Sequence, residues 1–160
     1  MYINDSINGP AWFIHSIINV DSKDKEILAL DTLNTKNIAI STETNSKKYL
    51  VDNESYVKLL EFESNKLKYE CNSKEDCFIV FSEIFYPHGW HLYIDGEKTQ
   101  YFNVNYLLRG IEVKSGNHII EFIFDPEIVK KGSMITLSAS LLLFIIIIGM
   151  AINSLLSIRN

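Results

Sequence analysis

The chain has 160 residues, with 20 acidic and 15 basic side chains and a formal net charge of −5 at pH 7. This length suits one soluble domain and an appendage, and an acidic surface repels phosphate backbones, which excludes most nucleic-acid binding. Nucleophile elbows, glycine-rich phosphate loops and C-x-x-C pairs are absent, so we expect no catalytic residue and no cofactor in this chain.

The first half of the chain carries short structural signals. Residues 1–10 are polar and lack the basic and apolar regions of a signal peptide. Residues 11–20 are apolar enough for a strand, and residues 37–42 predict another. Between them, Asp21 can cap a short helix, with Asp24 in the capping-box position. We expect the apolar side chains of this helix to share one side: Ile27, Leu28 and Leu30.

From residue 55 onward the pattern is strongly β. In residues 66–71 apolar side chains alternate with charged ones, which is the period of a half-buried strand. Residues 77–85 are almost continuously apolar and predict a central strand. Further short strands are expected at residues 56–62, 90–94, 99–104, 111–114 and 118–124, with hairpin turns at residues 72–76, 95–96 and 115–117. Strands at this spacing indicate an antiparallel β-sandwich, jelly-roll-like, over residues 1–127.

The C-terminal segment, residues 128–158, predicts one transmembrane helix. The 19 residues from Met134 to Ile152 contain eleven Leu, Ile or Phe side chains. At a rise of about 1.5 Å per residue they span roughly 28 Å, close to the hydrocarbon thickness of a bilayer. We therefore expect the lipid bilayer as a partner, with Lys130 and Lys131 at the membrane boundary. A buried core helix is the alternative, although so small a domain would hardly surround it.

The most specific stretch is residues 82–96, SEIFYPHGWHLYIDG. Pro87 and Gly89 break an apolar strand, and Asp95-Gly96 is a strong signal for a two-residue hairpin turn. This stretch resembles the S-E-x-x-Y-P-G-W segment and following D-G of bacterial YfhO-like integral membrane proteins. Residues 8–13 and 105–126 are similar to other parts of the same C-terminal domain. His88 departs from the family pattern, because it lengthens the corner by one residue.

The resemblance implies a parent protein with many membrane helices that looks like a glycosyltransferase using lipid-linked sugars. Its catalytic acids would lie in loops of a membrane bundle that this chain lacks. The resemblance also implies that the sandwich lies outside the cell membrane, and that this chain is the C-terminal piece of a longer protein. Taken alone, the chain would instead be tail-anchored with a cytoplasmic domain, and the basic residues flanking the span lean weakly the same way.

Cys71 and Cys77 flank an expected hairpin turn and could face each other at a distance that a disulfide spans. A bridge suits an extracytoplasmic domain, and thiols suit the cytoplasm. The alternative is a pair of small buried apolar side chains. No metal site is expected, because His88 and His91 lack the helical spacing of a zinc motif and other ligands are missing.

The candidate carbohydrate site lies at the corner around Pro87. It is formed by Glu83, Tyr86, Trp90 and His91. Aromatic rings offer flat apolar platforms for sugar faces, and a carboxylate accepts hydrogen bonds from sugar hydroxyls. The alternative makes Trp90 a core anchor, because it shares a strand face with Leu92 and Ile94. In that case Glu83 would pair with a backbone N–H.

Three functions remain open from the sequence. The first is a non-catalytic accessory domain of a YfhO-like protein that supports sugar transfer to cell-envelope polymers. The second is a stand-alone, single-span interaction or carbohydrate-binding module. The third, an envelope hydrolase using Glu83, lacks the second carboxylate that glycoside hydrolysis normally needs.

Overall fold

The structure, a computed structural model, describes residues 8–158, without the side chains of residues 127–130 and 151–158. The polar segment at residues 1–7 and Arg159 lie outside the described residues. The chain divides into two compact units, Met1–Asp125 and Pro126–Asn160. Each unit is described by itself.

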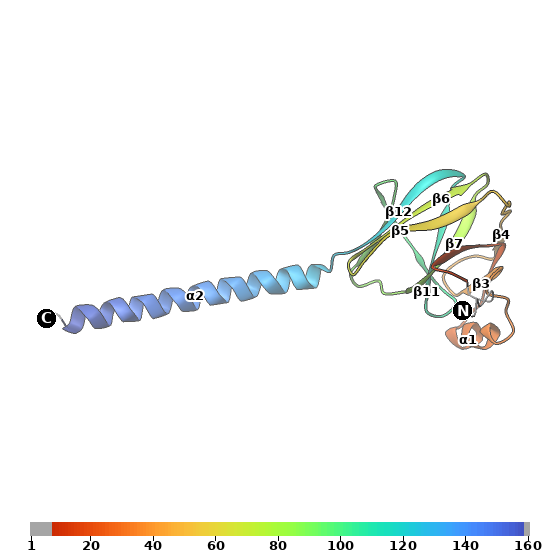
Figure 1. Cartoon of the computed structure of the whole chain (residues 1–160). Coiled ribbons are helices and arrows are strands. Elements are labelled where there is room, and N and C mark those ends of the chain that lie inside the picture. Colours follow the sequence, from red (N-terminus) through yellow and green to blue (C-terminus); the bar gives the residue numbers. More distant parts are fainter. Residues whose placement is uncertain (1–7, 159–160) are drawn as a thin grey trace, which may run out of the picture. The chain divides into compact units, whose positions relative to one another are not determined.

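The first unit is built on two antiparallel sheets that pack face to face (Figure 1). One sheet has the strand order β1 (Ala11–Ile14), β7 (Cys77–Ile84), β11 (Leu108–Val113) and β10 (Phe102–Val104). The other has the order β5 (Tyr56–Glu63), β6 (Lys66–Ser73), β12 (Gly116–Phe124), β8 (Trp90–Ile94) and β9 (Glu97–Thr99). Side chains from both sheets, including Phe81, Ile111, Tyr69 and Phe122, form one buried core. The predicted antiparallel sandwich is confirmed.

A small third sheet covers the outer face of the four-stranded sheet. Its order is β3 (Ile38–Ser41), β2 (Ser16–Asn19) and β4 (Lys47–Lys48), and the pair of β2 and β3 is parallel. A second core joins this layer to the sandwich through residues such as Ile17, Tyr49, Phe78 and Val80. Strand β7 is therefore buried on both faces, which explains its unbroken apolar run and confirms the predicted central strand.

Two of the three expected hairpins are wrong. Strands β6 and β7 lie in opposite sheets, and so do β11 and β12, so both connections are arches across the sandwich. An arch and a hairpin place alternating apolar residues against the core in the same way, so periodicity does not distinguish them. The third hairpin, between β8 and β9, is confirmed. Its turn residues Asp95 and Gly96 have φ values of 53° and 84°, as the turn requires.

The N-terminal segment differs from expectation in two details. Residues 11–20 form two strands in different sheets, β1 and β2, which separate at His15. The helix α1 (Lys23–Leu30) is capped by Ser22 rather than Asp21, because the Ser22 hydroxyl accepts from the Lys25 backbone N–H. The apolar side chains expected on one side of this helix are not its buried residues, since Ile27 and Leu28 are exposed and Leu30 is half-buried.

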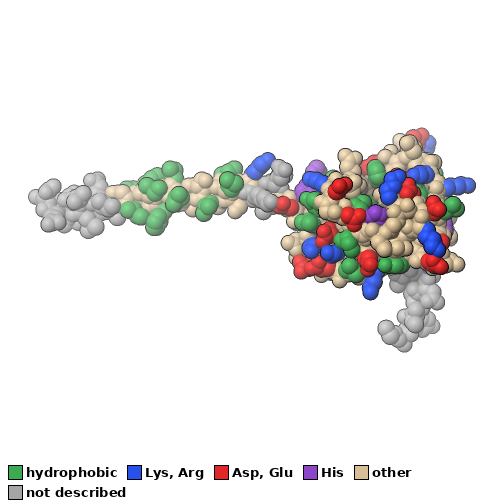
Figure 2. Space-filling model, turned by 90° about the horizontal axis from the view of Figure 1, so that it is seen from above, with side chains coloured by type: hydrophobic (Ala, Val, Ile, Leu, Met, Phe, Trp, Pro, Cys, Tyr) green, Lys and Arg blue, Asp and Glu red, His purple; other side chains and the backbone are tan. Residues whose placement is uncertain are grey.

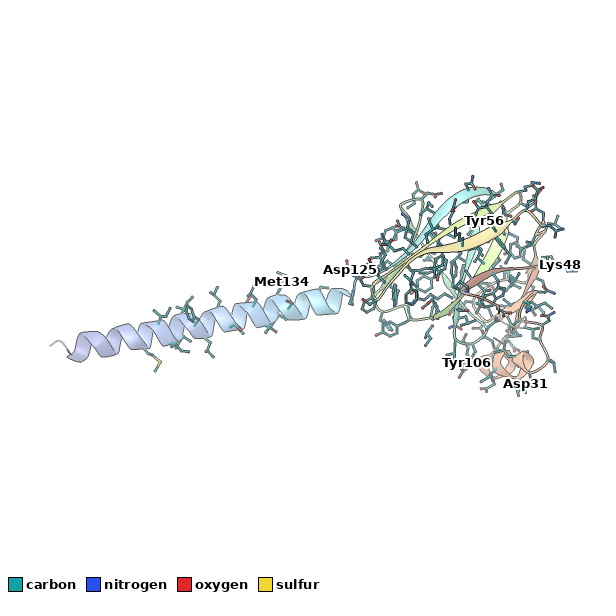
Figure 3. The ribbon with its side chains drawn as sticks, viewed as in Figure 1. Asp31, Lys48, Tyr56, Tyr106, Asp125 and Met134 are labelled. Carbon is teal, nitrogen blue, oxygen red and sulfur yellow. The ribbon has the colours of Figure 1, made fainter. Side chains whose placement is uncertain are left out.

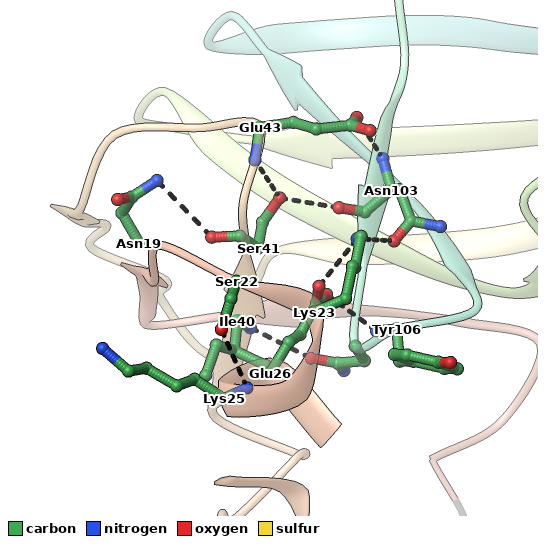
Figure 4. A network of polar contacts seen from close by, with 11 residues as sticks. Asn19, Ser22, Lys23, Lys25, Glu26, Ile40, Ser41, Glu43, Asn103 and Tyr106 are labelled. Carbon is green, nitrogen blue, oxygen red and sulfur yellow. Dashed lines mark hydrogen bonds and ion pairs between the residues drawn. The ribbon is translucent and has the colours of Figure 1, made fainter. Parts of the chain in front are cut away.

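The buried residue of α1 is instead Glu26, which is fully inaccessible to solvent. Its carboxylate accepts from the Lys23 ammonium at 2.7 Å and from the Tyr106 backbone N–H at 2.8 Å (Figure 4). Lys23 also donates to the Asn103 side chain, and the Ser41 hydroxyl donates to the Asn103 carbonyl. This polar network joins α1 and β3 to β10 and to the loop that follows it.

The second unit is the helix α2 (Glu127–Ile158). Residues Lys131–Met150 form a stretch long and apolar enough to cross a membrane, and none of it is buried within the structure. Figure 2 shows hydrophobic side chains along this helix, whereas acidic and basic side chains are interspersed over the first unit. The core helix of a soluble protein that passes the same length and composition test is instead mostly buried.

Candidate functional site

The site forms at the corner between β7 and β8, which belong to opposite sheets. Gly89 is buried and has a φ of 136°, a backbone conformation that side chains rarely adopt. Its N–H donates to the Pro87 carbonyl, and its own carbonyl accepts from the Asp125 N–H at 2.7 Å. The corner is thus fixed to the last residue of the sandwich.

A groove of about 350 Å³ opens beside this corner. Strand β8 contributes Trp90 and His91, and the segment between β9 and β10 contributes Gln100 and Tyr101. The complete lining combines apolar and polar groups: Glu43, Phe85, Pro87, Trp90, His91, Leu92, Lys98, Thr99, Gln100, Tyr101 and Phe102. Aromatic walls with a few polar groups are typical of small-ligand sites.

The aromatic wall is held in place from behind by Arg109. This side chain is only 2% exposed, and its guanidinium lies 4.4 Å from the Trp90 ring centre and 5.9 Å from that of Tyr101. Its Nε donates to the Ile84 carbonyl at 2.9 Å. On its other side Trp90 packs on Phe124, with ring centres 5.3 Å apart. Trp90 therefore contributes to the core as well as to the groove.

Tyr101 links the two sides of the groove. Its ring meets Phe85 edge-on at 5.3 Å, and its hydroxyl donates to the carbonyl of Tyr86 at 3.0 Å. Burial raises the pKa of the Tyr101 hydroxyl, so this donor keeps its proton at neutral pH. Burial likewise lowers the pKa of Arg109, and the neighbouring Tyr101 hydroxyl and Glu83 carboxylate act against that change.

The structure brings together two of the four candidate residues. Trp90 and His91 line the groove, whereas Glu83 and Tyr86 do not. Glu83 lies partly buried near Arg109, whose charged form it favours. The Tyr86 ring is 48% exposed and packs edge-on against the His88 ring. The carboxylate available to a ligand in the groove is that of Glu43, whose Oε2 also accepts from the Asn103 N–H.

Sequence reasoning missed the groove residues outside the corner. Tyr101 and Phe102 were assigned to one continuous strand, but that strand divides into β9 and β10 in opposite sheets. Their adjacent aromatic rings after Gln100 were the available signal. Glu43 is 47 residues from Trp90 in the sequence, and no local pattern connects the two.

A second, more polar depression of about 480 Å³ lies beyond β9. There the Asp95 carboxylate meets His118 Nδ1 at 2.6 Å and accepts from the Ile119 N–H at 2.8 Å. These two hydrogen bonds lower the pKa of Asp95. Asp95 thus fastens the hairpin turn between β8 and β9 to strand β12, and its contacts are those of a structural residue.

Cys71 and Cys77 are free and buried, and they enter the same core from opposite sheets. Their strands are not hairpin partners, since Cys71 pairs with Val57 and His118. Burial raises the pKa of Cys71 to about 12 and that of Cys77 to about 11, which keeps both as thiols. A disulfide between them stays a prediction for the oxidised protein.

Comparison with known proteins gives one match. The family model described as bacterial membrane protein YfhO matches residues 17–136, which reach from strand β2 into the apolar helix. No curated protein and no solved structure matches the chain. Because the match covers three quarters of the sequence and the chain ends in an apolar helix of membrane-spanning length, the protein belongs to the YfhO family of bacterial membrane proteins.

Proposed function

We propose that the sandwich is a non-catalytic accessory domain of a polytopic YfhO-type membrane protein, held outside the membrane by α2. In this role it binds envelope glycan while a membrane bundle transfers sugars from lipid-linked donors. The observation that carries the proposal is the groove beside the Pro87 corner, with the rings of Trp90 and Tyr101 in its wall.

The chemistry of the groove suits a sugar polymer. Phe85 and Tyr101 provide apolar ring surface, together with the part of Trp90 that Arg109 and Phe124 leave uncovered, and Lys98 and Gln100 provide hydrogen-bond donors. Glu43 adds an acceptor for hydroxyl groups. The groove is more open than enclosed, so a ligand larger than the groove can extend beyond it.

The test is binding of purified bacterial envelope polysaccharides to the full chain in nanodiscs. Lys98→Ala and His91→Ala remove donors from the groove without touching the Trp90 core contacts. Since one hydrogen bond contributes about 0.5–1.5 kcal/mol, each variant should weaken binding about 2–12-fold. The matched control is Lys58→Ala, an exposed lysine on β5 at the opposite edge of the same sheet. Equal binding by the groove variants and the control would refute the proposed site.

A further inference from the structure

Two loops flank the point at which the chain leaves the sandwich. The Phe124 N–H donates to the Asn65 carbonyl at 2.8 Å, and the Asp125 N–H donates to the Gly89 carbonyl at 2.7 Å. We call residues 62–65 and 86–89 the exit rim. Figure 3 labels Asp125 at this end of the sandwich and Tyr56 toward the other end. The exit rim is therefore fixed by hydrogen bonds to the segment that leads into α2.

The exit rim exposes aromatic side chains. Phe62 is 69% exposed and Tyr86 is 48% exposed, and Pro87 and His88 are exposed beside Tyr86. Glu63 is the single formally charged residue in residues 62–65 and 86–89. Exposed aromatic rings with little charge are typical of the membrane–water interface, where a ring is partly withdrawn from water and the hydroxyl of a tyrosine stays hydrated.

The covalent chain keeps this rim close to any bilayer that α2 crosses. Only Pro126 separates Asp125 from the first residue of α2, and the apolar stretch begins at Lys131. Pro126 in extended form and the helical turn and a half up to Lys131 together span about 10–13 Å, which is the largest distance from Asp125 to the apolar stretch. The headgroup layer on each side of a bilayer is about 5–8 Å thick. This limit follows from chain length and holds for every angle between the two units.

We propose that the exit rim is an interfacial membrane contact, with Phe62 and Tyr86 inserted among the lipid headgroups of the bilayer that α2 spans. The partner is the zwitterionic interface rather than anionic lipid, because the rim carries a carboxylate and no lysine or arginine. The rim is hydrogen-bonded to the segment that directly precedes the membrane span in the chain. For this reason we assign lipid, and not another protein surface, as the partner of these rings. Its two inserted rings are separate from the glycan-binding proposal, since Phe62 and Tyr86 do not line the groove, whereas Pro87 of the rim does.

The test measures the depth of fluorescent labels on the full chain in phosphatidylcholine nanodiscs that contain a headgroup nitroxide lipid. Single cysteines at Ser64 and His88 place the label on the exit rim. The matched control is Glu75→Cys in the loop after β6, because the eight residues of that strand hold it about 25 Å from Asn65. Wild-type protein gives the background from Cys71 and Cys77, which are buried and react slowly.

We expect nitroxide quenching at Ser64 and His88 at least twice that at Glu75, with little change between low and high salt. The double variant Phe62→Ser, Tyr86→Ser should reduce quenching of the Ser64 label by at least a third, to a level still above the control, because the tether keeps the rim near the bilayer without the rings. The matched pair Leu50→Ser, Tyr56→Ser, also exposed, should leave it unchanged.

Equal quenching at all three labels overturns the proposal. Quenching that is undiminished by loss of both rings overturns it as well, because proximity would then come from the tether alone. Labels shielded from aqueous iodide but not quenched by nitroxide lipid would overturn it in favour of a protein partner.

Discussion

Replacement of Glu26 by alanine should destabilise the sandwich more than replacement of an exposed charged residue does. Glu26 is fully buried at the base of α1, and its carboxylate accepts from the Tyr106 N–H at 2.8 Å. Asn105 and Tyr106 have φ values of 50° and 70°, a conformation that is costly for residues other than glycine. Loss of the acceptor leaves the partly buried Tyr106 N–H without its partner in this strained turn.

The magnitude follows from two contributions. A hydrogen bond to a charged group is worth about 1.5–3 kcal/mol. The ion pair with Lys23 adds at most about 1 kcal/mol, because the Lys23 side chain is 42% exposed and the pair is screened by water. The expected loss for Glu26→Ala is therefore about 2–4 kcal/mol in the free energy of unfolding. For a unit of 125 residues this corresponds to a fall in Tm of about 8–15 °C.

The assay is thermal unfolding of the full chain in nanodiscs, followed by tryptophan fluorescence. Glu26→Gln retains an oxygen acceptor for the Tyr106 N–H and should recover at least half of the loss. Lys25→Ala removes the exposed pair with Asp21 on the same helix and should change the free energy of unfolding by less than about 0.5 kcal/mol. A fall in Tm for Glu26→Ala no larger than that for Lys25→Ala would refute the reasoning.

Three further predictions concern the sandwich. Gly110→Ala places a Cβ 2.5 Å from the ring of a buried phenylalanine on β7, so unfolding experiments should show a loss of about 1–3 kcal/mol; wild-type stability would contradict the close packing. Asp95 has a lowered pKa in the folded state, so its stabilising effect is present above its ordinary value of 3.8 and is lost as the pH falls through the lower folded pKa. Tm measured between pH 5 and 2 should therefore fall less steeply in Asp95→Asn than in wild type, and parallel curves would exclude this role. The thiols of Cys71 and Cys77 should react with maleimide at pH 8 only after unfolding in urea, and fast reaction of the native protein would contradict their burial.

The sequence predicts best those features that a single strand or a single turn determines by itself. The apolar run at residues 77–85 predicts a central strand, and Asp95-Gly96 predicts a hairpin turn. Both predictions succeed because a single strand or turn determines them by its local geometry. Strand pairing was harder to predict. The connection from β11 to β12 looked like a hairpin, and only the packing of two whole sheets decides that it is an arch. The same limit applies to the groove, which assembles Glu43, Trp90 and Tyr101 from distant segments.

Helix α1 shows a second limit. The sequence places the apolar residues Ile27, Leu28 and Leu30 on one side of the helix, but the buried position belongs to a glutamate. A buried carboxylate is stable only where donors surround it, and here those donors are Lys23 and a backbone N–H that lies 80 residues away in the sequence. Tertiary hydrogen bonding therefore overrode the local apolar preference.

The extracytoplasmic position of the sandwich is the central claim behind an envelope role. The most direct measurement is labelling of Glu75→Cys by a membrane-impermeant maleimide in intact cells that make the protein in its natural context, with wild type as the background. The account predicts labelling in intact cells equal to that after lysis, because Glu75 is exposed at the end of the sandwich opposite the exit rim. Labelling that appears only after lysis would place the sandwich in the cytoplasm and contradict the proposed function.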